Sequence, residues 1–304
     1  MKPDVRPSLT ADNDYPPLAS FRWRLLAEGD SWFSIGTLIP KQASNILKEL
    51  VFTQSDVIVS CAEPGDTLVH MSERISDPYF AQRLFTPNMA SYWEAILISG
   101  GGNDMIDAAQ LAPTLTDGSP AAPNQRLLRT PAEVAAQPPG MGAERFISEP
   151  GWTLLAEHLC ACYQELVRLR QLGPSKNRPI CTHTYAVAVP RPAGASPSST
   201  EGWLNQAFNT YSIPSDQRVA LAALLFERLR ALLKSFDQAS GSPQALPQVH
   251  VFDSAGLTNI VPASFNAEGV SGDWVNEIHL SKAGLRKVGA AMGPWLEGVL
   301  ARYP

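Results

Sequence analysis

Ser31 and His279 are the residues whose types best fit a nucleophile and its base. Ser31 ends the run Gly29-Asp30-Ser31 directly after an apolar stretch, and His279 ends the run Asn276-Glu277-Ile278-His279 near the C-terminus. A histidine is the natural base for a serine hydroxyl, and it needs a partner on Nδ1 that fixes its tautomer and orientation. Each residue taken alone also has a structural explanation, Ser31 as a helix cap and His279 as a packed histidine.

Two further segments carry groups that could stabilise negative charge. One is Pro64-Gly65-Asp66-Thr67 and the other runs from Gly100 to Asn103. Glycine offers an unhindered backbone N–H and asparagine a side-chain amide, the donors that a developing tetrahedral oxyanion needs. The glycine run could instead form a tight turn. A phosphate-binding loop is disfavoured because the sequence has neither Gly-Lys-Ser/Thr nor G-x-G-x-x-G.

Short apolar runs alternate with longer helical patterns, which predicts an α/β fold. The expected strands cover residues 23–27, 56–61, 95–99, 179–185 and 248–252, and the clearest helices cover 154–172, 216–236 and 281–301. We expect a three-layer sandwich around a central parallel five-stranded sheet. Because ligands bind outside the carboxyl ends of the strands in such sheets, Ser31, Gly65 and Asn103 should meet at one edge.

The domain organisation is expected to be simple. Residues 1–20 are polar and rich in proline, and we predict that they form an N-terminal extension to a single domain over 21–304. Proline-rich stretches at about 111–151 and 190–202 interrupt the strand and helix rhythm, so we interpret them as insertions. Insertions of this kind are either functional lids or disordered segments, and both possibilities stay open.

Composition narrows the class of protein. The chain has 304 residues, of which 44% are hydrophobic and 17% charged, enough to bury a large core. The net charge of −5 and the absence of a basic stripe argue against a nucleic-acid partner. We expect a cytoplasmic protein with no stable membrane anchor, since no signal peptide or long apolar segment is found. Four cysteines at 61, 160, 162 and 181 indicate neither a disulfide framework nor a zinc site.

The four segments resemble, in this order, the sequence blocks of the SGNH or GDSL-type serine hydrolases. Gly29-Asp30-Ser31 is similar to the nucleophile block, Gly65 to the glycine block, Gly102-Asn103-Asp104 to the asparagine block and His279 to the histidine block. The resemblance covers residues 28–281 and implies the flavodoxin-like SGNH-hydrolase fold. Trp32-Phe33 and the run from Trp274 to His279 resemble a bacterial subgroup of lysophospholipase- or esterase-like members.

The resemblance implies acyl transfer without a metal or cofactor. Ser31 would attack a small-molecule ester, with His279 as base and with the N–H groups of Ser31 and Gly65 and the Asn103 amide as oxyanion hole. Trp32, His183 and Tyr185 are candidates for the substrate pocket. An apolar wall formed by Trp32, Phe33 and Tyr185 would favour lipid-like or aryl esters over sugar acetates, and we expect lipid-like or short-to-medium acyl esters. Alternatives are an acyltransferase or carbohydrate O-acetyl esterase on the same fold, or a catalytically silent binding protein. An α/β-hydrolase is disfavoured because no Gly-x-Ser-x-Gly occurs.

The sequence departs from the family pattern at two positions. Trp32 follows the serine where most members have leucine, and Asn276 stands three residues before His279, where the pattern has aspartate. An amide can accept a hydrogen bond from Nδ1 but cannot stabilise an imidazolium as a carboxylate does. Asp273 is therefore a candidate acid if its loop folds back. Asn276 as a neutral orienting group, or a dyad completed by a backbone carbonyl, are the alternatives.

Overall fold

A parallel sheet organises the part of the chain that the computed structural model describes, residues 1–34, 43–73, 77–196 and 200–303. Its six strands are β1 (Asp4–Pro7), β2 (Trp23–Gly29), β3 (Asp56–Ser60), β4 (Ala95–Ser99), β5 (Ile180–His183) and β6 (Val249–Phe252). They pair in the order β1-β3-β2-β4-β5-β6, and each pairing is parallel. The predicted α/β sandwich is therefore confirmed.

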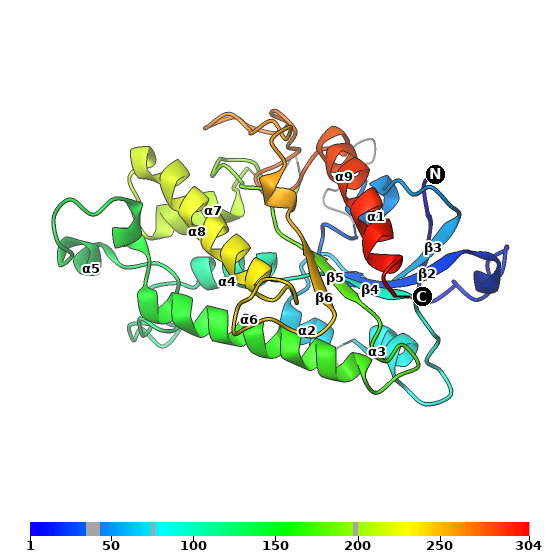
Figure 1. The fold of residues 1–304 in the computed structure, drawn as a ribbon. Helices are drawn as coiled ribbons and strands as arrows, with labels where there is room; N and C mark the ends of the chain where they lie inside the picture. The colour runs from blue at the N-terminus through cyan, green and yellow to red at the C-terminus, as the bar shows by residue number, and fades with distance from the viewer. Residues whose placement is uncertain (35–42, 74–76, 197–199, 304) are drawn as a thin grey trace.

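Helices cover both faces of the sheet. They are α1 (Ile46–Glu49), α2 (Leu68–Ser72), α3 (Pro78–Leu84), α4 (Gly102–Gln110), α5 (Pro131–Ala135), α6 (Glu149–Arg170), α7 (Trp203–Thr210), α8 (Ser215–Ser235) and α9 (Lys282–Leu300), with 3-10 turns η1 (Leu18–Ser20), η2 (Ala143–Phe146) and η3 (Ser254–Gly256). Helices α1 and α9 lie together on one side of the sheet, whereas α2, α3 and α6 lie on the other (Figure 1). The three long helices expected from apolar periodicity are α6, α8 and α9.

The expected strand count of five was one too low. The additional strand is β1, which lies in the segment expected to be a polar extension and pairs with β3 at the edge of the sheet. Edge strands are often short and polar, and they tolerate proline. β1 has only four residues and alternates Asp4 and Arg6 with Val5 and Pro7, so it lacks the apolar run by which the other strands were recognised.

The direction of strand progression reverses beside β2. The chain passes from β2 to β3 on one side and then returns to β4 on the other side of β2. Ala27 pairs with Ser60 and Gly29 with Ser99, so β2, β3 and β4 end at the same edge of the sheet. Such a reversal creates the crevice in which open α/β sheets bind ligands. The loops that carry Ser31, Gly65 and Asn103 all begin at this edge.

Close helix packing fixes the C-terminal part of the chain. A Cβ added to Gly289 of α9 would lie 2.1 Å from the carbonyl oxygen of Glu49, and one added to Gly293 would lie 2.1 Å from that of Val51. Glycine is therefore required for α9 to approach the end of α1 this closely. Ser281 caps α9 by accepting a hydrogen bond from the Gly284 N–H. The loop before α9, which carries His279, thus ends at a firmly packed helix.

The two proline-rich insertions both contribute buried residues, but only the first is described over its whole length. Residues 111–151 are described throughout and contain α5, η2 and the start of α6, with Leu127 and Leu128 fully buried. Apolar side chains of this segment thus join the core. In the second insertion Arg191 is fully buried, while residues 197–199 lie outside the described part of the chain.

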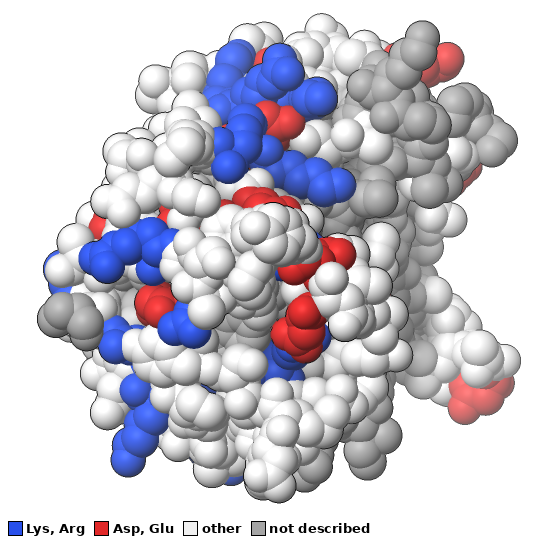
Figure 2. Space-filling view, turned by 90° about the vertical axis from the view of Figure 1, so that its right-hand side faces the viewer, with Lys and Arg blue, Asp and Glu red and all other residues white. Residues whose placement is uncertain are grey.

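The surface carries charges of both signs. On the face shown in Figure 2, Lys and Arg side chains gather mainly near the upper edge, with Asp and Glu among and below them. Among the described residues, no helix combines the length and apolar character that crossing a bilayer requires.

Candidate active site

The structure brings Ser31 and His279 into hydrogen-bond contact. Ser31 follows β2, His279 precedes α9, and the Ser31 Oγ lies 2.6 Å from the His279 Nε2. Both residues are 7% exposed, so the pair is largely shielded but reachable. This is the contact that a serine nucleophile and its general base require.

Asn276 fixes the tautomer of His279. Its Oδ1 lies 3.0 Å from the His279 Nδ1 and also accepts the backbone N–H groups of His279 and Ile278 at 2.9 and 3.2 Å. Two backbone donors identify this atom as the amide oxygen, so Nδ1 must carry a hydrogen and donate to it. Nε2 is then left as the acceptor for the Ser31 hydroxyl.

Asp273 does not approach His279, contrary to one expectation from the sequence. Its Oδ2 accepts the Val261 N–H at 2.6 Å and forms an ion pair of 2.6 Å with Lys287 of α9. A β-bridge between Trp274 and Leu280 closes the loop that carries His279. Asp273 precedes this bridge and lies outside the loop, whereas Asn276 lies within it. The partner of His279 Nδ1 is therefore an amide.

The environment keeps His279 uncharged. Burial lowers the pKa of His279 to about 3, because the charged imidazolium would lose its hydration. The His279 ring also packs edge-on against Trp203, the first residue of α7, with ring centroids 5.5 Å apart at 83°. A neutral imidazole can accept the serine proton, as a general base must.

Asn103 lies at the start of α4 and lines the same cavity as Ser31. Gly101 precedes this helix with φ of 107°, a left-handed conformation that glycine adopts at little cost. The Asn103 Nδ2 donates to the carbonyl of Asp66 at 2.8 Å, and both Asn103 and Ser31 line one small cavity. An amide nitrogen has two hydrogens, so one remains for an oxyanion.

Gly65 occupies the turn between β3 and α2. Its φ is 84°, and a Cβ at this position would meet no heavy atom within 4 Å, so the turn conformation and not crowding favours glycine here. Gly65 directly precedes Asp66, whose carbonyl holds the Asn103 amide. The residues expected to form the oxyanion hole thus belong to adjoining segments at one edge of the sheet.

A buried network of hydrogen bonds surrounds the side chain of Asp30, the residue before Ser31. The Asp30 carboxylate accepts hydrogen bonds from Ser99 Oγ at 2.7 Å, from the Trp32 N–H at 2.9 Å and from the Tyr185 hydroxyl at 2.6 Å. Burial nevertheless raises the pKa of Asp30 to about 6. His183 completes the network through Ser99, with Nε2 2.9 Å from Oγ.

The three residues expected in the substrate pocket have different positions. Trp32 and Tyr185 line the cavity at Ser31, but His183 does not. His183 is fully buried, its Nδ1 bonds to the Thr184 carbonyl, and burial lowers its pKa to about 4. Its place at the end of a strand suggested a pocket residue, but both ring nitrogens are used within the protein.

Glu277 and Arg191 hold the His279 loop in place, and the sequence analysis gave them no role. The buried Glu277 carboxylate accepts the backbone N–H groups of Arg191, Leu204 and Asn205 at 3.0, 2.8 and 2.8 Å. The Arg191 guanidinium in turn donates to the Asn276 carbonyl at 2.6 Å. Glu277 lies in the run that ends at His279, so its carboxylate could have been recognised from the sequence as a candidate for holding this loop. No feature of the sequence pointed to Trp203 or Arg191.

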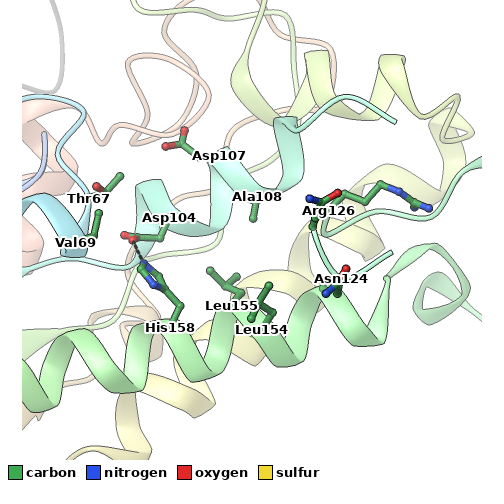
Figure 3. A pocket seen from close by; sticks show the side chains of 12 residues that line it. Thr67, Val69, Asp104, Asp107, Ala108, Asn124, Arg126, Leu154, Leu155 and His158 are labelled. Carbon is green, nitrogen blue, oxygen red and sulfur yellow. Dashed lines mark ion pairs between the residues drawn. The ribbon is translucent and has the colours of Figure 1, made fainter. Parts of the chain in front are cut away.

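The cavity at Ser31 is small, about 10 Å³, which is room for roughly one water molecule. Its apolar wall includes Ile106, Phe226 and Ile278. A separate cavity of about 430 Å³ lies between α4 and α6, where His158 faces Asp104 at 3.5 Å and Leu154 and Leu155 form one wall (Figure 3). Among the described residues, no cluster of His, Cys, Asp and Glu could hold a metal ion.

Comparison with known proteins gives matches in structure only. No protein-family model and no curated protein matches the sequence. The lipase Lip_vut3 from a goat rumen metagenome is similar with a TM-score of 0.50 at 14% identity, over 91% of this chain and 97% of the lipase. An extracellular lipase from Streptomyces rimosus gives 0.47 at 12% identity, over 91% and 99% of the two chains. The carbohydrate acetylesterase Est24 from Sinorhizobium meliloti gives 0.45 at 11% identity, over 91% and 100%.

The similarity to Lip_vut3 shows that this chain has the fold of that lipase. This fold agrees with the α/β sandwich that the resemblance of the four sequence segments implies.

Proposed function

We propose that this protein hydrolyses carboxylic esters through an acyl-enzyme on Ser31. The observation that carries the proposal is the 2.6 Å contact between Ser31 Oγ and the unprotonated Nε2 of His279. Asn103 lines the same cavity, so an amide donor is available next to the nucleophile. The similarity in fold to a lipase agrees with this chemistry but does not carry it.

The reaction would proceed in two halves. His279 Nε2 takes the Ser31 proton while Oγ bonds to the ester carbon, and the carbonyl oxygen becomes an oxyanion facing the N–H groups of Ser31 and Gly65 and the Asn103 amide. Collapse breaks the ester C–O bond, and the proton on Nε2 passes to the departing alkoxide. Water, deprotonated by His279, then releases the carboxylic acid and restores Ser31.

The acyl group is proposed to be short. The cavity at Ser31 has a volume of about 10 Å³ and is closed by Trp32, Ile106 and Tyr185. A methyl group is about the size of a water molecule, so the cavity formed by these described residues suits an acetyl group better than a long chain. Short acyl esters were one of the two substrate classes expected from the sequence, and this wall favours them over lipid-like acyl chains.

The test is hydrolysis of p-nitrophenyl esters from acetate to palmitate by the wild type and by Ser31→Ala. We expect the highest kcat/KM on acetate and loss of turnover in Ser31→Ala. Ser119→Ala is the matched control, because Ser119 is exposed in the insertion and its hydroxyl bonds only to nearby Asp117 among the described residues. A Ser31→Ala enzyme as active as the wild type would refute the proposed nucleophile.

A further inference from the structure

The Asn103 amide can serve an oxyanion only if its orientation is held by other groups. Its Nδ2 donates one hydrogen to the Asp66 carbonyl at 2.8 Å, and the second hydrogen is then directed by this bond. Asn103 lies in the first turn of α4, whereas Asp66 lies two residues before the start of α2. The orientation of the amide therefore depends on how the start of α2 is held against the start of α4.

We infer that Asp104 is a positioning residue for the oxyanion hole, which it keeps assembled by joining α2 to α4 beside Asn103. The inference rests on the proposed ester hydrolysis. Asp104 directly follows Asn103, and its carboxylate accepts the backbone N–H of Leu68, the first residue of α2. The Leu68 nitrogen lies 3.3 Å from Oδ1 and 3.2 Å from Oδ2. Two adjacent side chains of α4 thus hold the same segment, Asn103 through the Asp66 carbonyl and Asp104 through the Leu68 N–H.

The start of α2 depends on Asp104 because the helix does not cap itself. Thr67 occupies the N-cap position, but its side chain makes no hydrogen bond to the helix. The acceptor for the Leu68 N–H therefore comes from α4. Leu68 is fully buried, so without the Asp104 carboxylate its N–H would be left away from water with no partner, which is costly. We expect the segment with Asp66 to move relative to α4 when this carboxylate is removed.

The side chain of Leu68 packs against the same part of the chain that Asp104 belongs to. A Cβ added to Gly100 would lie 2.6 Å from the Leu68 Cδ2, so the leucine side chain lies directly against the backbone of the turn before α4. Leu68 is thus fixed twice to the segment 100–104, through its side chain at Gly100 and through its N–H at Asp104. The asparagine between these two contacts is the proposed oxyanion donor.

His158 of α6 is a second partner of Asp104. Its Nε2 lies 3.5 Å from Oδ1, and the two side chains point toward each other from α6 and α4 (Figure 3). The contact with the Asp104 carboxylate raises the pKa of His158, because the carboxylate stabilises the imidazolium. The His158 side chain is 41% exposed, so water screens this pair. We therefore assign the positioning to the buried hydrogen bond with Leu68 and not to the ion pair.

The test measures kcat and KM of single variants on p-nitrophenyl acetate. We expect Asp104→Ala to lower kcat about ten- to a hundredfold with little change in KM, because a displaced oxyanion donor is felt in the transition state. Asp104→Asn keeps an oxygen that can accept the Leu68 N–H, so it should retain most of kcat. His158→Ala and the matched control Asp107→Ala, an exposed carboxylate of the same helix, should behave as the wild type. A loss in His158→Ala as large as in Asp104→Ala would overturn the assignment to Leu68.

A double-mutant cycle with Asn103→Ala separates positioning from a general loss of stability. Since Asp104 acts through Asn103, Asp104→Ala should lower kcat by less than about twofold in a chain that already lacks the Asn103 amide. The same fold loss in both backgrounds would overturn the inference. Should Asp104→Ala fail to fold, Asp104→Ser replaces it with the same expectations, because its shorter side chain draws the acceptor away from Leu68.

A spectroscopic readout makes the inference independent of turnover. The side-chain amide resonances of Asn103 in a nitrogen–proton correlation spectrum report the hydrogen bond to the Asp66 carbonyl. They should shift in Asp104→Ala and stay in place in His158→Ala and Asp107→Ala. Unshifted resonances in a folded Asp104→Ala would overturn the positioning role. Failure of the proposed hydrolysis looks different, because the wild type would then show no turnover that depends on Ser31.

Discussion

The Asn276 side-chain oxygen lies 3.0 Å from the His279 Nδ1 and accepts two backbone N–H groups of the same loop. Three donors converge on this one atom, so the position requires an acceptor but does not require a charge. An aspartate oxygen at the position of Oδ1 could accept the same three hydrogen bonds. The loop is therefore compatible with either residue, and the amide leaves the imidazole without a carboxylate partner.

Asn276→Asp should convert the proposed site to one with a charged orienting group. A carboxylate beside Nδ1 stabilises the imidazolium, so the pKa of His279 should rise from its burial-lowered value of about 3. We expect a larger kcat and an acid limb of the kcat/KM profile at higher pH than in the wild type. In the wild type, His279 stays neutral above its lowered pKa, so it should cause no inflection near pH 6.5. The pH–rate profiles of both proteins provide the measurement, and identical profiles would contradict the role of residue 276.

Asn103→Ala should slow catalysis without unfolding the protein. Loss of one oxyanion donor typically lowers kcat about 100- to 1,000-fold, and KM should change little because the lost interaction forms in the transition state. Steady-state kinetics on p-nitrophenyl acetate provide the measurement. Asn13→Ala, at an exposed position in the N-terminal segment, should have wild-type kinetics. Wild-type kcat in Asn103→Ala would exclude the amide from the oxyanion hole.

Ile106→Val should widen the acyl cavity by one methyl group. Ile106 is 5% exposed and lines the cavity at Ser31. We expect kcat/KM on propionate to rise relative to acetate, with a stability cost of about 0.5–1.5 kcal/mol. Ile180→Val provides the control, because Ile180 is fully buried in β5 and does not line the cavity. Acyl preferences that change equally in both variants would argue against a wall at Ile106.

Asp30→Asn should change how stability depends on pH. The Asp30 pKa is raised from 3.8 to about 6 in the folded protein, so the folded state holds a proton that the unfolded state has lost between these values. The stability contributed by Asp30 is therefore present below pH 4 and is lost as pH rises through 6, by an amount on the order of 3 kcal/mol. Urea unfolding at pH 4, 5, 6 and 7 measures it.

The wild type should thus lose stability relative to Asp30→Asn as the pH rises over this interval. Asp14→Asn, at an exposed position, is the control and should have the stability of the wild type in the same measurement. A constant difference between wild type and Asp30→Asn would show that Asp30 ionises with an ordinary pKa.

Glu277→Gln should loosen the loop that carries His279. The substitution places an amide NH₂ against backbone N–H donors that now face carboxylate oxygens. One mismatched buried group costs about 1–3 kcal/mol, so we expect a lower melting temperature together with a lower kcat. Glu49→Gln is the matched control, since Glu49 is also buried and paired but is the last residue of α1, where it pairs with Lys2 and with Arg286 of α9. It should lose stability and keep its kcat; an equal loss of kcat in both variants would assign Glu277 a general structural role.

The types and order of the residues predicted most of the sheet and the grouping of the candidate site residues, because parallel strands end at a common edge. Once the apolar runs of β2, β3 and β4 were recognised, Ser31, Gly65 and Asn103 had to lie near one another. Asp273 was chosen for its charge, and the pairing of Trp274 with Leu280 and the position of Lys287 could not be foreseen. Trp203 escaped notice because its contact with His279 depends on how α7 packs, which no local pattern encodes.

The proposed catalytic pair joins residues that are 248 positions apart in the chain. During synthesis Ser31 emerges before His279, which follows only after the six strands of the sheet, and the loop with His279 is secured by α9, which comes after it. Domains can begin to fold as they leave the ribosome, yet no partial chain ending before His279 can activate Ser31. If the proposed reaction is correct, Ser31 stays unreactive on the nascent chain until the segment with His279 has been made and α9 has packed behind it.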